Sequence, residues 1–387
     1  MIRVNNYYKY FSFFLIILSI SSYFIGFKYS ENSAGGGPAD YIHVWSNLQT
    51  FLNNSIVDGV HLTATYDSET YMSARTPLVY IFHKLFNPFV GNEILFKRSV
   101  FFMSFLVPIL FYISLKEKFR KEENLLLALI SSVIFLSPYF RTSSYWALEE
   151  NFSLIALLIS FLFLNKFLRD GNSLWQNYYQ LFLTVFFSSA CVYFDQKFII
   201  IPIICFAKII FSDKSLKLKF YSFFIYFIFS LPFIYLIILW GNIIPTRDAV
   251  ARGAGNQIFF HHLGYVFTIL AFYFLPLLLF KSENLSKLIK NFFSQRKNYY
   301  FVSVFLIYLI YLLFFHNYSE ERLLGKGFIY KTAILLFKDI FLQKLFIYCS
   351  FFFSWIVILM YLNDSIKNKI SSLKKDQFNF RFRKSQG

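Results

Sequence analysis

Asp40 is the residue with the clearest capacity for acid–base chemistry. It follows the breaker stretch Gly35-Gly-Gly-Pro38, just beyond a first apolar segment. A carboxylate in this position can serve as a general base that removes a proton from an acceptor hydroxyl. Alternatively it caps a helix by accepting hydrogen bonds from free backbone N–H groups. His43 lies one helical turn further on and is expected to share the face of Asp40.

Charged residues interrupt the apolar pattern at two later points. Glu149 and Glu150 are adjacent at the start of an apolar segment, so they must either reach water or have a cationic partner. Gln196 and Lys197 occupy a tight turn between two apolar segments, where an ionisable group is a functional candidate. A lysine at this point can instead extend its ammonium group to the membrane surface.

Arginines among glycines form a candidate phosphate site. Arg247 and Arg252 lie in a glycine-containing stretch with Asp248. Guanidinium donors and exposed backbone N–H groups can together surround phosphate oxygens. Arg75, in a loop returning towards the membrane, suits the same role or that of an interface anchor. A flexible basic loop is the alternative for residues 247–252.

Metal and nucleotide chemistry have little support in the sequence. His261 is a candidate for substrate binding, but His261 and His262 are adjacent and would point about 100° apart on a helix, so no paired metal site is expected. The three cysteines form no CxxC motif. P-loop, GxGxxG, HExxH and GxSxG motifs do not occur. We therefore expect no bound cofactor, and leave a divalent metal open.

The composition places these residues in a membrane protein. Hydrophobic residues make up 57% of the 387 residues, charged residues 15%, and Phe alone contributes 56. A spanning helix needs about 20 mostly apolar residues, and such runs recur along the chain. We predict an all-α, polytopic transmembrane helical bundle of about ten spans. The expected spans are 11–27, 99–115, 125–140, 150–165, 177–194, 197–211, 220–240, 261–280, 299–316 and 345–362.

The distribution of charge predicts the orientation. The formal net charge of +17 could suggest nucleic acid, but Lys and Arg cluster in short segments between apolar runs and in the tail 363–387. That pattern is typical of cytoplasmic loops, so we expect no nucleic-acid partner. The opposite, non-cytoplasmic segments carry nearly all the candidate residues above. Any chemistry is therefore predicted to face away from the cytoplasm.

The longest non-cytoplasmic segment is the loop 28–98. Within Asp40–Asn54, apolar residues recur at helical spacing, which predicts an amphipathic helix lying in the membrane interface. Pro77–Phe86 is expected to form a second short helix, with Pro77 at its start. No internal repeat is visible, so residues 1–387 are predicted to form a single transmembrane domain.

This arrangement resembles the GT-C superfamily of membrane glycosyltransferases, in which an acidic residue opens a long outer loop after the first span. The order of motifs is most similar to the dolichyl-phosphate-glucose α-1,2-glucosyltransferase family. The stretches that carry the likeness are Pro38-Ala-Asp40-Tyr-Ile-His43, Arg75-Thr-Pro77-Leu-Val-Tyr80, Phe194-Asp195-Gln196-Lys197 and Trp240 through Arg247-Asp248 to His261-His262. The family's acidic pair is reduced here to one Asp, and its Asp-Arg pair is reversed.

The resemblance implies an inverting hexosyltransferase whose donor is a polyprenyl-phosphate-linked sugar and whose acceptor is a glycan or lipid-linked hydroxyl. Asp40 would be the base, and Arg75, Arg247 and Arg252 the phosphate partners. The enzyme would lie in a cell inner membrane or the ER membrane, among membrane lipids, with its site towards the periplasm, exterior or lumen. A transporter or flippase of lipid-linked sugars and a catalytically silent assembly subunit are the alternatives.

Overall fold

The structure, a computed structural model, describes residues 6–32, 36–65, 76–169, 171, 173–241, 260–281, 285–316 and 328–384. Every regular element in these ranges is an α- or 3-10 helix, which confirms the all-α prediction for the described chain. The chain divides into two compact units, unit 1 (residues 1–255) and unit 2 (residues 256–387). Two compact units are compatible with one membrane domain, so the single-domain assignment remains a prediction.

Unit 1 contains a succession of helices joined by short connections. Its described α-helices are α1 (Asn6–Lys28), α2 (Gly37–Asn53), α3 (Ile56–Thr65), α4 (Leu78–Phe86), α5 (Glu93–Met103), α6 (Leu106–Lys118), α7 (Asn124–Ser132), α8 (Pro138–Tyr145), α9 (Glu150–Phe167), α10 (Leu174–Phe194), α11 (Ile200–Ile210) and α12 (Leu216–Trp240). Two 3-10 helices, η1 (Val133–Leu136) and η2 (Gln196–Ile199), precede α8 and α11.

Within the described residues, six helices are long and apolar enough to cross a membrane. They are Lys9–Lys28, Glu93–Lys118, Glu150–Phe167, Leu216–Trp240, Arg296–Phe315 and Ile340–Asn363. The segment Asn124–Tyr145 adds a seventh if its two parts, which are bent by 65° before Pro138, count as one broken span. About ten spans were expected, and the described residues do not support that number. The segment predicted as 197–211 shows one reason, because α11 has only 11 residues.

The exposed surface of these helices is apolar, as expected for contact with lipid. On α1, Phe13, Phe14 and Ile17 are more than half exposed, and on α12 Phe220 and Phe224 are similarly open. A soluble protein would have to bury such contiguous rings. The chain is therefore a multi-pass helical membrane protein.

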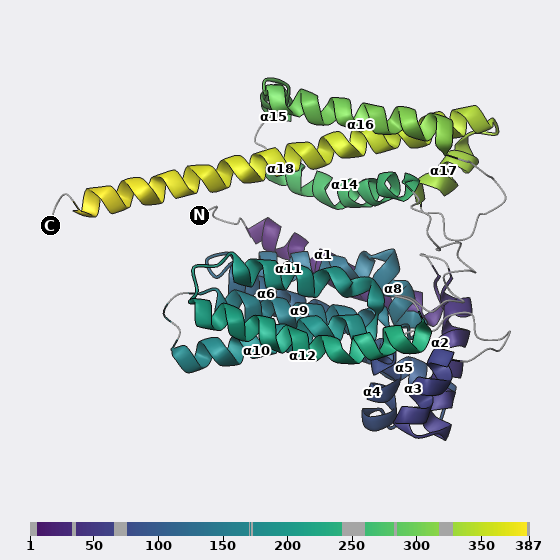
Figure 1. Cartoon of the computed structure of the whole chain (residues 1–387). Coiled ribbons are helices and arrows are strands. Elements are labelled where there is room, and N and C mark those ends of the chain that lie inside the picture. The colour runs from purple at the N-terminus through teal and green to yellow at the C-terminus, as the bar shows by residue number, and fades with distance from the viewer. Residues whose placement is uncertain are drawn as a thin grey trace. The chain divides into compact units, whose positions relative to one another are not determined.

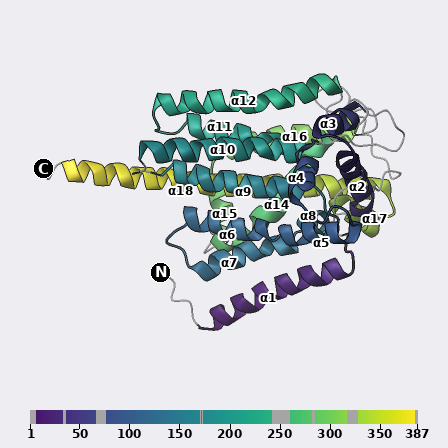
Figure 2. The same ribbon diagram turned by 90° about the horizontal axis from the view of Figure 1, so that it is seen from below.

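The long helices of unit 1 stand side by side in a row. α12 packs on α10, α10 on α9, α9 on α6, and α7 links α6 to α1; Figure 2 shows this order from α12 across to α1. Because consecutive helices alternate in direction, their connections gather at two ends. One end, here called the basic end, has the connections 119–123, 168–173 and 211–215.

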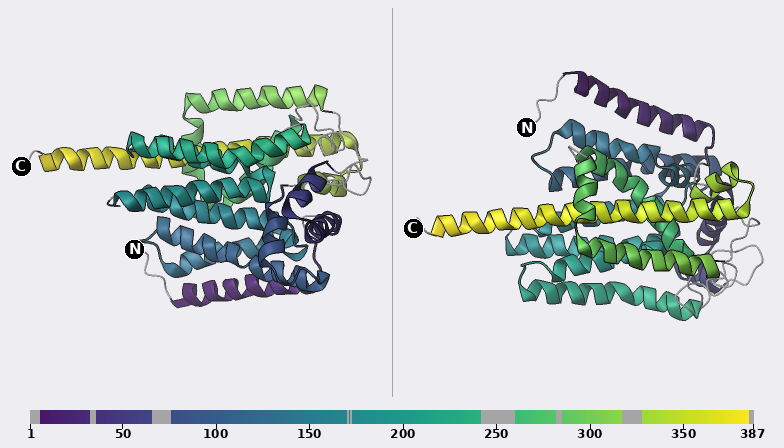
Figure 3. Two further views of the ribbon diagram at one scale, coloured as in Figure 1. Left: turned by 60° about the horizontal axis from the view of Figure 1, so that its bottom comes forward. Right: turned by 90° about the horizontal axis from the view of Figure 1, so that it is seen from above.

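The other end, here called the α2 end, carries α2, α3, α4, α8 and the turn before η2 (Figures 1 and 3). The predicted helices in the loop 28–98 are present as α2 and α4, and α3 was not predicted. The apolar face of α2, including Val44, Leu48 and Phe51, is buried. It packs on protein, because these side chains share a core with Val79 and Tyr80 of α4.

Lys84 fixes the far end of α2. Its ammonium group donates to the backbone carbonyl oxygen of Phe51 at 2.7 Å and also to that of Asn54. A cation at the C-terminus of a helix complements both the unpaired carbonyls and the helix dipole. This contact ties α4 to the end of α2, on which α3 also packs.

Unit 2 is a smaller helical bundle. It contains α14 (His261–Lys281), α15 (Leu285–Phe293), α16 (Arg296–Phe315), α17 (Phe328–Leu336) and the 45-residue α18 (Ile340–Lys384). α18 packs on α14, α16 and α17. Gly264 allows the close approach of α14 to α18, since a Cβ there would lie 2.6 Å from Cγ of Phe351. The predicted tail 363–387 is largely the last part of α18.

Candidate functional site

A guanidinium network fixes the start of the α2 end. Arg141 of α8 pairs with Glu31 at 2.7 Å and donates to the carbonyl oxygen of Ser22 at 2.6 Å. Its Nε donates to the Tyr145 hydroxyl at 2.9 Å, and that hydroxyl donates to the carbonyl of Tyr23 at 2.7 Å. The network joins the end of α1 to α8, so the turn leading into α2 has a defined position.

Two glycines then direct α2 across the bundle. Gly36 has φ of +77°, the left-handed conformation that side chains resist. Gly37 follows, and a Cβ there would lie 2.8 Å from Cγ of the Trp146 ring. The backbone N–H of Gly37 donates to the Asn32 side chain at 3.0 Å. Larger residues would push the first turn of α2 away from Trp146.

Asp40 lies in this first turn, one residue before the buried Tyr41. The N-cap of α2 is Gly36, so the alternative that Asp40 is the capping residue is wrong. Its carboxylate lies near Gly36, where a Cβ would be 3.1 Å from Oδ2, and its side chain is only partly buried. His43 is on the next turn and is also partly buried. The carboxylate thus lies near the helix start, although Asp40 is not the N-cap residue.

Glu150, Asp195 and Lys197 form a charge cluster on neighbouring helices. The Lys197 ammonium lies 3.0 Å from Oε1 of Glu150 and 3.5 Å from Oδ2 of Asp195. Asp195 is 4% exposed and caps η2, its Oδ1 accepting the Lys197 backbone N–H at 3.0 Å. The cationic partner predicted for the adjacent glutamates is therefore Lys197, which lies 47 residues from Glu150.

The electrostatics of this cluster favour the charged lysine. Burial alone would lower the pKa of Lys197, but the carboxylates of Glu150, Asp195 and Glu149 together raise it above the usual lysine value. Glu149 is 2% exposed, so its carboxyl group sits in the interior. Three acidic groups around one ammonium leave this part of the α2 end with surplus carboxylate.

Buried polar side chains lie next to the charge cluster. Ser143 donates to Oε2 of Glu150 at 3.1 Å. Asn151 donates to the hydroxyls of Ser104 and Ser144 at 2.9 and 2.7 Å, and all three side chains are buried. Oε1 of Gln196 is buried without a hydrogen-bond partner within the described residues. A buried amide oxygen in that state can accept a hydrogen bond from a bound molecule.

An apolar floor connects Asp40 with the charge cluster. Tyr41 of α2, Ala147 and Leu148 before α9, and Phe152 of α9 belong to one buried core, and Phe194, next to Asp195, packs against it. The Phe194 ring centroid is 5.8 Å from that of Phe152. Residues on both sides of this floor are thereby held by one rigid core.

His83 lies within the same core and was not singled out from the sequence. It is fully buried, its ring centroid is 4.9 Å from those of Phe96 and Phe152, and its Nδ1 is 3.1 Å from Nδ2 of Asn87. Burial lowers the pKa of His83 to about 3. The imidazole is therefore neutral and structural at neutral pH.

The predicted site residues fall into three groups. Unit 1 brings Asp40, His43, Glu149, Glu150, Gln196 and Lys197 to the α2 end. Arg75, Arg247, Asp248 and Arg252 lie outside the described residues. Asp195 belongs to the charge cluster although it was not selected, and its position beside Gln196 and Lys197 was the available signal.

His261 belongs to unit 2, where it meets other histidines. Its ring stacks on that of His316 with centroids 4.4 Å apart, and the His262 centroid is 4.5 Å away. His316 Nδ1 lies 3.1 Å from the Tyr348 hydroxyl. Across the described residues, no group of three His, Cys, Asp or Glu side chains has a geometry suited to a metal ion.

Comparisons with known proteins give no assignment. No family model matches the chain, and neither the curated proteins nor the solved structures include a match.

Proposed function

We propose that the chain is an inverting membrane glycosyltransferase of GT-C type that transfers a hexose from a polyprenyl-phosphate-linked donor to an acceptor hydroxyl. The observation that carries the proposal is the gathering of acidic side chains at the α2 end. Glu149 and Asp195 are almost completely buried there. Burial of carboxyl groups is expensive and is typical of functional sites in membrane proteins. A helical membrane protein needs no such group for its orientation, because Lys and Arg supply that signal.

The chemistry assigned to Asp40 is general base catalysis. Its carboxylate takes the proton of the acceptor hydroxyl, and the acceptor oxygen attacks C1 of the sugar from the face opposite the phosphate. The bond between C1 and the phosphate oxygen breaks, its electron pair remains on that oxygen, and polyprenyl phosphate leaves. The rigid first turn of α2, set by Gly36 and Gly37, favours this role because a base must be held in place.

Lys197 is assigned an electrostatic role at the same end. It is the cation of the charge cluster, where it lies between Glu150 and Asp195. Arg75, Arg247 and Arg252 remain predicted partners of the departing phosphate. The proposed orientation places the basic end in the cytoplasm and the α2 end towards the periplasm, exterior or lumen. About ten spans in total remain part of the proposal.

The test uses the purified full chain in nanodiscs with radiolabelled polyprenyl-phosphate glucose, mannose or galactose and a lipid and glycan extract of its host membranes. The proposal predicts a labelled product together with release of polyprenyl phosphate. A transporter or flippase moves its cargo without breaking a bond. Recovery of the lipid-linked sugar intact, with no labelled product, would therefore contradict the proposal. Heat-inactivated protein supplies the background rate.

A further inference from the structure

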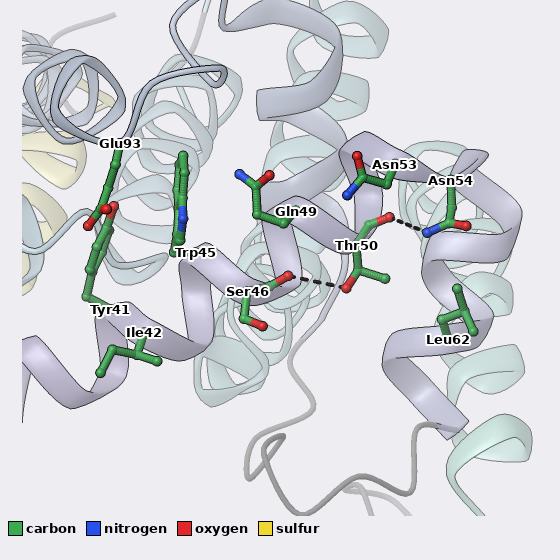
Figure 4. Close-up of a pocket in the computed structure, with 10 residues that line it drawn as sticks. All are labelled: Tyr41, Ile42, Trp45, Ser46, Gln49, Thr50, Asn53, Asn54, Leu62 and Glu93. Atoms are coloured by element: carbon green, nitrogen blue, oxygen red, sulfur yellow. Dashed lines mark hydrogen bonds between the residues drawn. The ribbon is translucent and has the colours of Figure 1, made fainter.

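A pocket of about 640 Å³ lies along α2, away from the charge cluster. Its volume falls in the range of small-molecule sites. Figure 4 shows several of its side chains along one side of α2. The lining residues are Tyr41, Ile42, Trp45, Ser46, Gln49, Thr50, Asn53, Asn54, Leu62 and Glu93.

The pocket and Asp40 occupy different faces of α2. Successive helical residues turn by about 100°. Gln49, in the middle of the side of α2 that lines the pocket, therefore points nearly opposite to Asp40. Asp40 is instead close in angle to Phe51, on the face that packs against the protein. A ligand in the pocket would therefore contact the face of α2 that points away from Asp40, the proposed base.

The lining favours a neutral ligand with many hydroxyl groups. It combines two aromatic rings with side-chain amides and hydroxyls, and neither Lys nor Arg is among its described residues. The Glu93 carboxylate has a countercharge in Lys97, 4.0 Å away. The Lys97 ammonium group lies over the Tyr41 ring, 3.9 Å from its centroid, and is already paired with Glu93. A phosphate or another anion would meet the Glu93 carboxylate beside this cation, so an anionic ligand is disfavoured.

The Tyr41 hydroxyl and the Glu93 carboxylate lie together at one end of the pocket (Figure 4). Tyr41 is 4% exposed, and Glu93 is the hydrogen-bonding group beside its hydroxyl. Burial and the nearby Glu93 carboxylate raise the pKa of Tyr41 well above its usual value, so the hydroxyl remains a donor. A carboxylate has several lone pairs, so Glu93 can accept from Tyr41 and also from a hydroxyl of a bound ligand.

Other polar side chains on the pocket side of α2 are also available for binding. No hydrogen bond from the side chain of Gln49 or Asn53 occurs within the part of the chain that the structure describes. The Trp45 ring, whose centroid is 5.5 Å from that of Phe96, is held in place and partly exposed. Aromatic faces with adjacent amides are suited to the apolar faces and hydroxyl edges of a pyranose.

We propose that this pocket binds the neutral saccharide part of the acceptor, at sugar units remote from the hydroxyl that reacts. The inference rests on the proposed glycosyl transfer and names the class of acceptor. Because the pocket faces away from Asp40, its side chains contribute affinity and not chemistry. Substitutions in it raise the acceptor KM and leave kcat nearly unchanged.

The test measures binding separately from transfer. Equilibrium dialysis with the full chain in nanodiscs uses labelled trisaccharides of glucose, mannose and galactose, with trigalacturonate as the anionic counterpart. We expect a dissociation constant below about 1 mM for at least one neutral trisaccharide and no binding of trigalacturonate. Asp40→Asn should bind the trisaccharide as the unchanged protein does, which separates failure of this inference from failure of the catalytic proposal.

Variants of the pocket complete the test. Gln49→Ala and Trp45→Ala should weaken binding by about 3-fold and 10-fold or more. Trp175→Ala, at a 78% exposed ring on α10, is the matched control and should have no effect. If Trp45→Ala fails to fold, Asn53→Ala, at an exposed side chain, replaces it. Absence of trisaccharide binding at about 10 mM, equal binding of trigalacturonate, or no response to Gln49→Ala would each overturn the inference.

Discussion

The two ends of unit 1 carry the same kind of charge cluster with opposite sign. At the basic end, Glu117 pairs with both Arg120 and Arg169, so a carboxylate lies between two cations. At the α2 end, Lys197 lies between Glu150 and Asp195, so a cation lies between carboxylates. The cationic surplus suits an anionic membrane leaflet. The acidic surplus has no such use, which is why the α2 end is the candidate site.

Arg120 and Arg141, one arginine at each end, differ in burial. Arg120 has a side chain that is 55% exposed, whereas Arg141 at the α2 end is 13% exposed. An exposed pair contributes little to stability, while removal of one partner from a buried pair leaves the other uncompensated. Structure should therefore depend strongly on Arg141 and only weakly on Arg120.

The largest expected effect on stability comes from Arg141→Met. The substitution leaves Glu31 without its partner and removes the donor to the Ser22 carbonyl, so the free energy of unfolding should fall by about 3 kcal/mol. SDS titration of purified protein in mixed micelles measures it. Arg120→Met is the matched control and should cost less than about 1 kcal/mol. Equal losses for the two variants would remove the distinction between the ends.

The next effect is a dependence on pH that originates in His83. Its pKa in the folded protein is about 3, below the usual histidine value, so the unfolded chain binds the proton more readily between these values. Stability is fully present at neutral pH and is lost as the pH falls below about 6.5. Between pH 7 and pH 5 the loss should be about 2 kcal/mol.

His83→Gln keeps a hydrogen-bonding group near Asn87 but cannot titrate. Melting curves in detergent at pH 7 and pH 5 should show that this variant lacks the part of the pH dependence assigned to His83. If the unchanged protein and His83→Gln respond to pH equally, the buried neutral histidine is not responsible.

The smallest effect concerns the coupling between Glu150 and Lys197. Because the Lys197 side chain is 59% exposed, a double-mutant cycle with Glu150→Gln and Lys197→Met should give a coupling of about 0.5 to 1 kcal/mol. Transfer activity should respond more strongly, with Lys197→Met lowering the rate about 10-fold. Lys121→Met, at the basic end, should retain full transfer activity. An equal loss of activity in both variants would show that Lys197 has no specific role at the α2 end.

The sequence predicted those features that depend on local patterns. Helical spacing of apolar residues in Asp40–Asn54 predicted α2, and Pro77 correctly preceded α4. For the adjacent Glu149 and Glu150, contact with water or a cationic partner was expected, and Glu150 has such a partner in Lys197. That partner could not be identified, because Lys197 reaches Glu150 only through the packing of α9 against α10.

Other features depended on geometry that spacing does not encode. Asp40 was left as a base or a cap, and only the backbone at Gly36 decided that it is not the cap. The span predicted at 197–211 was counted by composition, although a 3-10 helix shortens the α-helix there. The pocket on α2 was missed because it also needs Glu93 and Leu62 from other helices.

The central claim is that the Asp40 carboxylate acts as the base at the α2 end. The direct measurement compares sugar transfer by the unchanged protein, Asp40→Asn and Asp58→Asn at equal amounts of folded protein. Asp58 is a matched control, because it is an exposed carboxylate near the start of α3 that accepts from Ser55 at 2.6 Å. The account predicts a loss of about 100-fold or more for Asp40→Asn and none for Asp58→Asn. Full activity of Asp40→Asn would contradict it.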